Sequence, residues 1–318
     1  MNTVAVAWMA GALVLFSGNA RAADWYVDAV SGSDSNTGAT PAQAWRTISK
    51  ALTSTRTLQP ERIHIAAGLY DAALGEQFPL DVWEGQALLG AGPGLTRVVS
   101  AGPFALGVHH YPARPFAGFS SDTQVQGLSL VATYQPLLVS STWGPVRAEF
   151  RELEVSGAAS QGIFVYGTVA LIEPVFERVD SHGNSIGLGA SRGTIVVRDS
   201  RLHHNTQSGL VVSTTTLVTC RVERTRLDAN GAWGLDARAN FVAPAAYGRV
   251  DVTVDGCELS GNMGGAQLLV AAQPVWIAPS SLILTQCTVA GNSGDGVGDS
   301  GVGGSIDLEE SVLASNGA

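Results

Sequence analysis

The nine-residue stretch Val222–Asn230, which reads VERTRLDAN, decides the fold because its pattern occurs six times in the second half of the chain. Each copy begins with an apolar residue, has a small or apolar residue at its fourth and sixth positions, and ends with asparagine. The other copies are Phe176–Asn184, Val197–Asn205, Val254–Asn262, Leu284–Asn292 and Leu308–Asn316. Successive asparagines lie 21 to 32 residues apart, so loops of different length join a constant structural unit.

Short alternating segments follow the repeated unit. Gly209–Ser213 and Gly234–Arg238 each begin with glycine and continue with the period-two pattern of a β-strand. Strands in stacked units of this length predict an all-β parallel solenoid, with adjacent coils about 4.8 Å apart. Equivalent positions of successive copies then form columns.

The residues in these columns test the predicted register. One column contains Glu177, Arg198 and Glu223, whose alternating signs favour it because stacked like charges are destabilising. Another is an asparagine ladder, which we expect to be structural because asparagine tolerates a left-handed corner and its amide can bond the next asparagine. The ladder residues are Asn184, Asn205, Asn230, Asn262, Asn292 and Asn316.

The composition excludes several classes of protein. Hydrophobic residues make up 45% of the 318 residues, which excludes a disordered chain, and the 38 glycines favour strands and turns over a helical bundle. The formal net charge of −9 disfavours nucleic acid as a partner. The sequence has no Gly-rich phosphate loop, HExxH or GxSxG motif, so nucleotide hydrolysis, zinc protease and α/β-hydrolase activities have no support.

The first residues predict export. Val4–Phe16 is an apolar run too short to span a bilayer, and the small-residue sequence Ala20-Arg21-Ala22 follows it. We expect residues 1–22 to be a signal peptide. The mature protein would be secreted, periplasmic or at the cell surface, without a membrane span.

The three cysteines, Cys220, Cys257 and Cys287, are too few for a disulfide framework. Cys257 and Cys287 occupy the same position in neighbouring copies, so their side chains would point in parallel. This geometry predicts a stacked pair of buried thiols, with a strained disulfide as the alternative.

The chain before the repeats predicts a cap. Trp25–Asp28 is strand-like, and Trp45–Leu58 has the pattern of an amphipathic helix that would cover the open end of the solenoid. We therefore assign residues 23–100 to the cap and first coils, and residues 101–318 to the parallel β-helix coils. The last copy ends near Ala318, so we expect that the chain is incomplete or that another chain covers this end.

Several N-terminal segments resemble a known family. They are Tyr26-Val27-Asp28, Gly32-Ser33-Asp34, Asn36, Gly38, Trp45–Ile48, Ala51-Leu52, Ala66–Tyr70, Glu76–Leu80 and Leu89–Gly92. Together they are similar to the domain of unknown function that opens many secreted pectin-lyase-like proteins. The resemblance implies a right-handed parallel β-helix with an N-terminal cap, but no settled activity, since this fold carries lyases, hydrolases, epimerases and adhesins.

The leading candidate site lies beside the longest loops. Alternation places Asp236 and Arg238 on the outer face of one strand, and the adjacent insertions carry Phe241, Tyr247 and Trp276. Arginine can pair with a uronate carboxylate, aspartate can act as acid, base or cation ligand, and aromatic rings stack on sugars. We predict a carbohydrate groove with Asp236 and Arg238 as catalytic residues and the three aromatic residues in substrate binding. The competing interpretation is a surface ion pair beside loop-packing rings.

An alternative polar column lies two positions before the ladder asparagines. It contains His182, His203 and Asp228 on three successive copies, with His204 adjacent. Neighbours about 4.8 Å apart could share a proton or a metal ion, although the third residue stretches a single zinc site. Exposed polar turn residues are the simpler interpretation.

The sequence assigns no metal site and demands no cofactor, but two oxygen-rich segments would suit calcium. They contain Asp28, Asp34 and Asn36 in the first case and Asp295, Asp299 and Asp307 in the second. Neither segment matches an EF-hand or a nonapeptide calcium repeat, and ordinary Asx-turns are the simpler explanation.

These patterns predict an exported protein that binds or cleaves an acidic polysaccharide, such as a cell-envelope glycan, with lyase or hydrolase chemistry where it cleaves. The rival function is that of a non-catalytic surface or scaffold protein with an unknown partner. A lyase acting on uronates releases an unsaturated sugar that absorbs in the ultraviolet, which separates the two functions.

Overall fold

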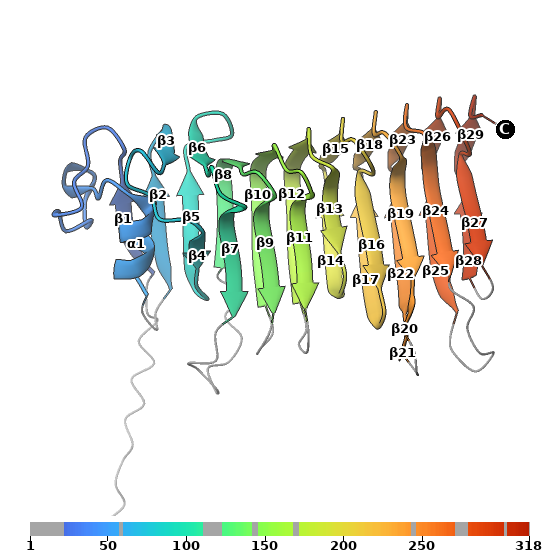
Figure 1. Ribbon diagram of the computed structural model, residues 1–318, viewed down its shortest axis with the longest axis horizontal. Helices are drawn as coiled ribbons and strands as arrows, with labels where there is room; N and C mark the ends of the chain where they lie inside the picture. Colours follow the sequence, from blue (N-terminus) through green and yellow to red (C-terminus); the bar gives the residue numbers. More distant parts are fainter. Residues whose placement is uncertain are drawn as a thin grey trace, which may run out of the picture.

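The computed structural model describes residues 22–56, 60–110, 123–141, 146–167, 172–242, 246–270, 279–301 and 304–317. They form one elongated stack of coils, with the cap at one end and the last repeat at the other (Figure 1). In this part of the chain, two strand ladders make up an 18-stranded sheet A, and a third is the nine-stranded sheet B. The predicted right-handed parallel β-helix is confirmed.

A complete coil passes through the long ladder of sheet A, the short ladder of sheet A and then sheet B. The long ladder contains β1 (Ala23–Val27), β2 (Glu61–Ile65), β5 (Gln86–Gly90), β8 (Thr123–Val131), β10 (Val146–Ser156), β12 (Ile172–His182), β14 (Gly193–Arg198), β17 (Leu217–Glu223), β22 (Arg249–Asp255), β25 (Ser280–Thr285) and β28 (Gly304–Glu309). The short ladder contains β3 (Gly68–Asp71), β6 (Thr96–Val99), the C-terminal parts of β8, β10 and β12, and then β15 (Arg201–His203), β18 (Arg226–Asp228), β23 (Glu258–Ser260), β26 (Thr288–Ala290) and β29 (Val312–Ala314).

Sheet B closes each coil on the remaining side. It contains β4 (Leu80–Val82), β7 (Phe104–His110), β9 (Gln135–Ser141), β11 (Gln161–Gly167), β13 (Ile186–Ala190), β16 (Leu210–Thr214), β19 (Trp233–Ala239), β24 (Gly264–Val270) and β27 (Val297–Gly301). The side chains of Leu210, Val212, Leu235 and Ala237 are completely buried, as their alternation predicts. The core therefore runs as a continuous apolar column along the axis of the stack.

The helix of the cap is shorter than its sequence pattern predicts. The α1 helix spans Ile48–Ser54, within the predicted Trp45–Leu58. The side chain of Thr47 caps the first turn, and the backbone N–H of Thr55 closes the last turn by donating to the Ala51 carbonyl at 2.9 Å. These two end contacts set the helix length. A single 3₁₀ turn, η1 (Pro41–Gln43), precedes it.

The asparagine ladder lies at the corner between the short ladder and sheet B. The Oδ1 of Asn230 accepts the backbone N–H of Asn205 at 3.2 Å, and its Nδ2 donates to Asn262 Oδ1 at 2.9 Å and to the Leu202 carbonyl at 3.1 Å. The same pattern repeats to Asn316. Asn230 is only 3% exposed, so the ladder satisfies backbone groups that water does not reach.

The cysteines are buried thiols, and the alternative of a disulfide does not occur. The backbone N–H of Thr225 donates to Cys257 Sγ at 3.3 Å, and Cys287 occupies the same place one coil further. Burial raises the pKa of Cys220 to about 12, so this thiol stays protonated and unreactive.

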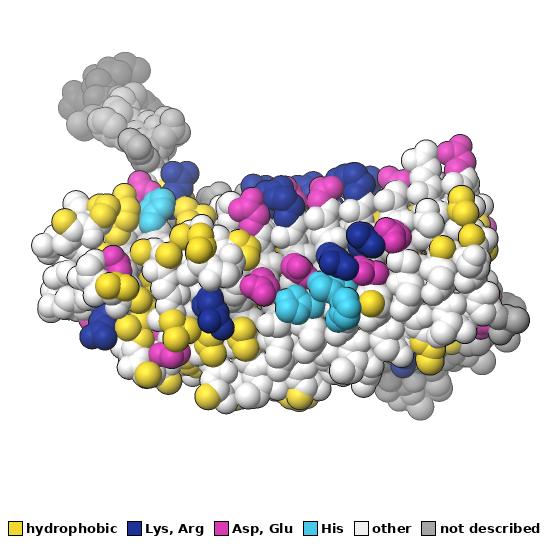
Figure 2. Space-filling view, turned by 90° about the horizontal axis from the view of Figure 1, so that it is seen from above, with side chains coloured by type: hydrophobic (Ala, Val, Ile, Leu, Met, Phe, Trp, Pro, Cys, Tyr) yellow, Lys and Arg dark blue, Asp and Glu magenta, His cyan; other side chains and the backbone are white. Residues whose placement is uncertain are grey.

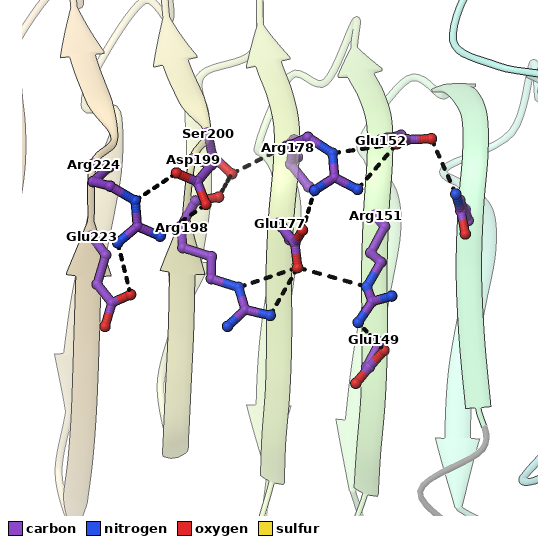
Figure 3. A network of polar contacts seen from close by, with 12 residues as sticks. Glu149, Arg151, Glu152, Glu177, Arg178, Arg198, Asp199, Ser200, Glu223 and Arg224 are labelled. Atoms are coloured by element: carbon purple, nitrogen blue, oxygen red, sulfur yellow. Dashed lines mark hydrogen bonds and ion pairs between the residues drawn. The ribbon is translucent and has the colours of Figure 1, made fainter.

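Ion pairs connect the coils across the outer face of sheet A (Figure 3). Glu177 on β12 accepts from Arg198 Nη2 at 2.8 Å, and Arg151 Nε on the opposite side lies 3.7 Å away. The hydrogen bond from Arg198 lowers the pKa of Glu177. The charge alternation predicted for this column therefore corresponds to a contact between coils at Glu177 and Arg198, whereas Glu223 contacts Arg221 and Arg224.

Three sequence predictions concern the ends of the chain. The signal peptide falls almost entirely on residues 1–21, which lie outside the described residues, and the boundary at residue 100 stays a prediction. In the last coil, Leu308 and Leu313 are 44% and 48% exposed, and a covering chain likewise stays a prediction. No helix in the described ranges is long and apolar enough to cross a membrane.

Replacing a central ladder residue should destabilise the whole stack. We expect Asn230→Ala to lower the free energy of unfolding by about 3 kcal/mol, because it leaves the Asn205 N–H and the Leu202 carbonyl buried without partners. Urea unfolding followed by circular dichroism measures the change. The matched control is Asn240→Ala, which removes an exposed asparagine. Equal effects of the two substitutions would contradict a structural ladder.

The sheet A ion pairs should make stability depend on pH. The folded-state pKa of Glu177 lies below its ordinary value of 4.5, so its ion pairs stabilise the fold above that pH and are lost as the pH falls through the folded pKa. We therefore expect Glu177→Gln to lower the urea midpoint at pH 7. The midpoints of the variant and the parent should converge as the pH falls through the folded-state pKa of Glu177. A difference that persists at acidic pH would instead indicate a packing defect.

Candidate functional site

Asp236 and Arg238 lie together on the outer face of β19 in sheet B. Arg238 Nε donates to both carboxylate oxygens of Asp236, at 2.8 and 2.9 Å, and Arg238 Nη2 also contacts Oδ2. The hydrogen bond to Asp236 raises the pKa of Arg238, so the guanidinium is a permanent cation. Asp236 is 1% exposed, whereas the Arg238 side chain is 47% exposed.

The exposure of Asp236 corrects the sequence prediction. Strand alternation places this side chain on the outer face, where it was expected to meet the substrate as an acid or base. Instead, the guanidinium of Arg238 binds its carboxylate, and Gln267, 8% exposed, lies beside it on the next coil. Asp236 therefore orients Arg238, and Arg238 is the group that can meet a ligand.

The structure describes the backbone of two of the three predicted aromatic residues, Phe241 and Tyr247. The hairpin of β20 (Phe241–Val242) and β21 (Ala246–Tyr247) follows β19, and Phe241 pairs with Tyr247 in its register. The insertion therefore begins directly after the strand that carries Arg238, as predicted. Trp276 lies outside the described residues. The role of all three residues in substrate binding stays a prediction.

Trp233, at the start of β19, is an aromatic residue of this face that the sequence pattern does not single out. Its ring lies against Gly264 on the next coil and extends towards Gly298 on the coil after that. A Cβ at Gly298 would lie 3.1 Å from the ring atom Cη2. The signal in the sequence is the glycine at the matching position of the next copy, because glycine inside a strand often marks a close approach.

A pair of aromatic residues lies on the same face of sheet B. Phe164 on β11 leans over Gly189 on the next coil, where a Cβ would lie 3.4 Å from the ring. Its ring stacks on that of Tyr166 at a centroid distance of 5.9 Å, and Tyr166 is 43% exposed. Sheet B thus combines flat aromatic surfaces with one oriented, solvent-facing arginine.

The alternative polar column forms on the short ladder of sheet A. His182, His203 and Asp228 lie in register on β12, β15 and β18, and the two imidazole rings are 5.2 Å apart. Figure 2 shows histidine side chains gathered with acidic and basic side chains near the middle of one face. The predicted spatial order of the three residues is correct.

The proposed sharing of one metal ion by these three residues does not fit the contacts. Arg201 donates to both oxygens of Asp228, at 2.9 and 2.6 Å. Burial raises the pKa of Asp228, but the bonds from Arg201 outweigh it and lower the pKa overall. Within the described ranges, no group of three or more His, Cys, Asp or Glu side chains is placed to hold a metal.

His203 and His204 instead form a hydrogen-bonded chain with Asp180, whereas His182 Nε2 contacts Glu154 at 3.3 Å. His203 Nε2 lies 2.8 Å from Asp180 Oδ1, and His203 Nδ1 lies 2.6 Å from His204 Nδ1. Burial lowers the pKa of His203, which favours the neutral ring. Its proton then lies on Nε2, facing the carboxylate, so His204 Nδ1 donates to His203 Nδ1. The arrangement can relay a proton from His204 towards Asp180.

The first calcium candidate consists of turn contacts. Asp28 accepts the backbone N–H of Val30 at 2.8 Å, and Asp34 accepts that of Arg46 at 2.9 Å. A hydrogen bond from Ser31 lowers the pKa of Asp28. These contacts are those of Asx-turns and loop anchors. In the second candidate, Asp295 precedes β27, Asp299 lies on β27 and Asp307 lies on β28.

Comparisons with known proteins agree with this architecture. The family model of a protein of unknown function, DUF1565, matches residues 30–134. The structure is similar to that of the pectate lyase Pel9A, with a TM-score of 0.57 and 13% identity over 89% of this chain and 78% of that chain. It is also similar to the A-module of the Azotobacter vinelandii mannuronan C-5 epimerase AlgE4, with a TM-score of 0.52 and 12% identity over 92% of this chain and 96% of that chain. No curated protein matches the chain in sequence.

These findings define the class of the protein. It has a pectin-lyase-like parallel β-helix fold, and its N-terminal part matches the domain of unknown function predicted from the sequence. Both parts of the predicted resemblance are therefore confirmed.

The histidine chain should be visible in a titration. We expect His203 to titrate below the ordinary value of 6.5, and Asp180→Asn to lower its pKa further, because the carboxylate of Asp180 stabilises the imidazolium. Two-dimensional NMR of ¹⁵N-labelled histidine measures both effects and identifies the tautomer. The control Asp81→Asn, in β4 of sheet B, should leave His203 unchanged. A zinc-dependent shift of His182 and His203 would restore the metal interpretation.

Proposed function

We propose that the protein binds an acidic polysaccharide along the outer face of sheet B, with Arg238 pairing to a uronate carboxylate. The observation that carries this proposal is the orientation of Arg238 by the buried carboxylate of Asp236, on the strand that also carries Trp233. Among the described residues, no hydrogen bond occupies Nη1 of Arg238. A charged donor that is held in place before binding loses little conformational freedom when a ligand arrives.

The rest of sheet B supports the same function. Trp233, Phe164 and Tyr166 present ring surfaces, which stack well on the apolar faces of sugars. Sheet A is less suitable, since its charged side chains are joined to one another between coils (Figure 3). Two proteins that share the fold are, by name, a pectate lyase and a mannuronan epimerase, and pectate and mannuronan are polyuronates.

The exported location and any cleavage are part of this proposal. Asp236 is covered by Arg238, so a catalytic step on this face would need a base other than Asp236. Incubation with polygalacturonate and alginate, followed by ultraviolet absorbance, tests for lyase products. Binding without turnover would assign the protein to the non-catalytic class.

Substitution of Arg238 should weaken binding selectively. We expect Arg238→Gln to lower the affinity for trigalacturonate about tenfold, the usual loss for one charge-assisted hydrogen bond. Isothermal titration calorimetry measures this, and Trp233→Ala should weaken binding by a similar factor through loss of stacking.

The matched control is Arg221→Gln, because the side chain of Arg221 is 62% exposed on sheet A. We expect it to bind trigalacturonate like the parent. Equal losses in both arginine variants would show that only net charge matters. No binding of any oligouronate by the parent would reject the proposal.

A further inference from the structure

A pocket of about 310 Å³ opens at the cap end of the stack, between α1 and residues 77–83, which include β4. Both elements lie at this end in Figure 1. The floor is apolar because Leu52 and Leu80 are buried, and Phe78 and Trp83 line the walls. A concave site of this size with an apolar floor and a few polar groups suits a small ligand or one unit of a polymer. We call it the cap pocket.

Hydrogen bonds hold the two sides of the cap pocket together. The buried carboxylate of Glu76 accepts the backbone N–H groups of Ile48 and Ser49, at 2.6 and 2.9 Å. The backbone N–H of Gln77 donates to Ser49 Oγ at 2.8 Å. The start of α1 is therefore fixed to the segment that carries Phe78. A pocket that is formed before binding loses little conformational freedom when a ligand enters.

Arg56 is the cation that lines the cap pocket, and its charge is available to a ligand. Its Cζ lies 2.9 Å from the centroid of the Trp83 ring, so a cation–π interaction holds the guanidinium flat on the indole. Across the described ranges, no carboxylate forms an ion pair with Arg56 and no hydrogen bond engages its guanidinium. The side chain is exposed, and the edge of a stacked guanidinium keeps its N–H donors for a planar carboxylate.

Asp81 is the acidic residue among the described residues that line the cap pocket, and no ion pair connects it to Arg56. It has an interaction of its own, but a carboxylate offers about four acceptor positions. Asp81 can therefore also accept hydrogen bonds from sugar hydroxyls. An arginine for a carboxylate and an acid for hydroxyls together suit a uronate unit.

The register of sheet B places the cap pocket on the same outer face as Arg238. Asp81 begins a column that continues through Phe164 to Asp236. β4 and β19 are six strands apart in the sheet, which corresponds to about 29 Å at about 4.8 Å per coil. A glycan that runs along sheet B from Arg238 towards the cap would therefore meet the cap pocket.

We propose that the cap pocket is a second uronate subsite, in which Arg56 pairs with the carboxylate, Asp81 accepts a hydroxyl and Phe78 packs on the sugar ring. The inference rests on the proposed binding of an acidic polysaccharide by sheet B, and it adds a second anchor at the cap. One chain of the polymer then contacts the protein at Arg56 and Arg238 together.

Calorimetry with trigalacturonate separates the two subsites, because this ligand is too short to reach both. We expect two sites per chain in the parent. Arg56→Gln and Arg238→Gln should each weaken a different one of them about tenfold, the usual loss for one charge-assisted hydrogen bond. The matched control is Lys50→Gln, which removes an exposed cation from the same helix outside the pocket and should leave both sites unchanged. The methyl ester of trigalacturonate lacks carboxylates and should bind weakly at both sites.

The results distinguish the cap pocket from the site at Arg238. A single site in the parent that Arg238→Gln weakens and Arg56→Gln does not would overturn the cap pocket and leave the proposed function standing. A site weakened by Arg56→Gln alone would keep the cap pocket and reject the role of Arg238. Equal losses in Arg56→Gln and Lys50→Gln would show an effect of net charge and overturn the inference.

Chain length provides a second measurement. Size-fractionated oligogalacturonates should bind about a hundredfold more tightly once they reach from Arg238 to Arg56, because the second contact becomes intramolecular. Arg56→Gln should abolish this rise while the affinity for trigalacturonate at Arg238 stays unchanged. A rise with length that is the same in the parent and in Arg56→Gln would contradict a second anchor.

Discussion

The structure depends on the hydrogen bonding of each coil to the next at a dry corner. The side chains of the ladder from Asn184 to Asn316 form hydrogen bonds with backbone groups that would otherwise be buried without partners. Each side-chain amide bonds to a neighbouring coil. Loop length is therefore free to vary on one edge of the stack, while the corner is not. The same constraint fixes the register of the coils, which determines which outward-facing residues lie next to one another.

Given that register, the two sheets differ in what they can offer a ligand. On sheet A, charged side chains form ion pairs between coils, as Glu177 does with Arg198. Few of its cations are therefore available to a ligand. On sheet B the outward residues are mostly small, aromatic or polar, and Arg238 is the exposed cation paired within its own strand.

The histidine chain illustrates how register and contact can disagree. His203 and Asp228 are neighbours in the column, yet Asp228 is bound by Arg201, and His203 turns to Asp180 and His204. Side chains reach diagonally as well as along a column, so adjacency in the column does not determine pairing. Column spacing alone therefore predicts which residues lie near one another but not which of them bond.

The sequence by itself determined the coils, because the nine-residue repeat fixes both the inward apolar positions and the Asn corner, and it indicated the charge columns, such as Glu177 beside Arg198. It also indicated that the side chain of Arg238 lies on the outer face of its strand. Only the tertiary structure decided that Asp236 is covered by Arg238 and that the ring of Trp233 lies on Gly264. Periodicity specifies which face a side chain occupies, whereas exposure depends on rotamers and on neighbours two dozen residues away in the chain.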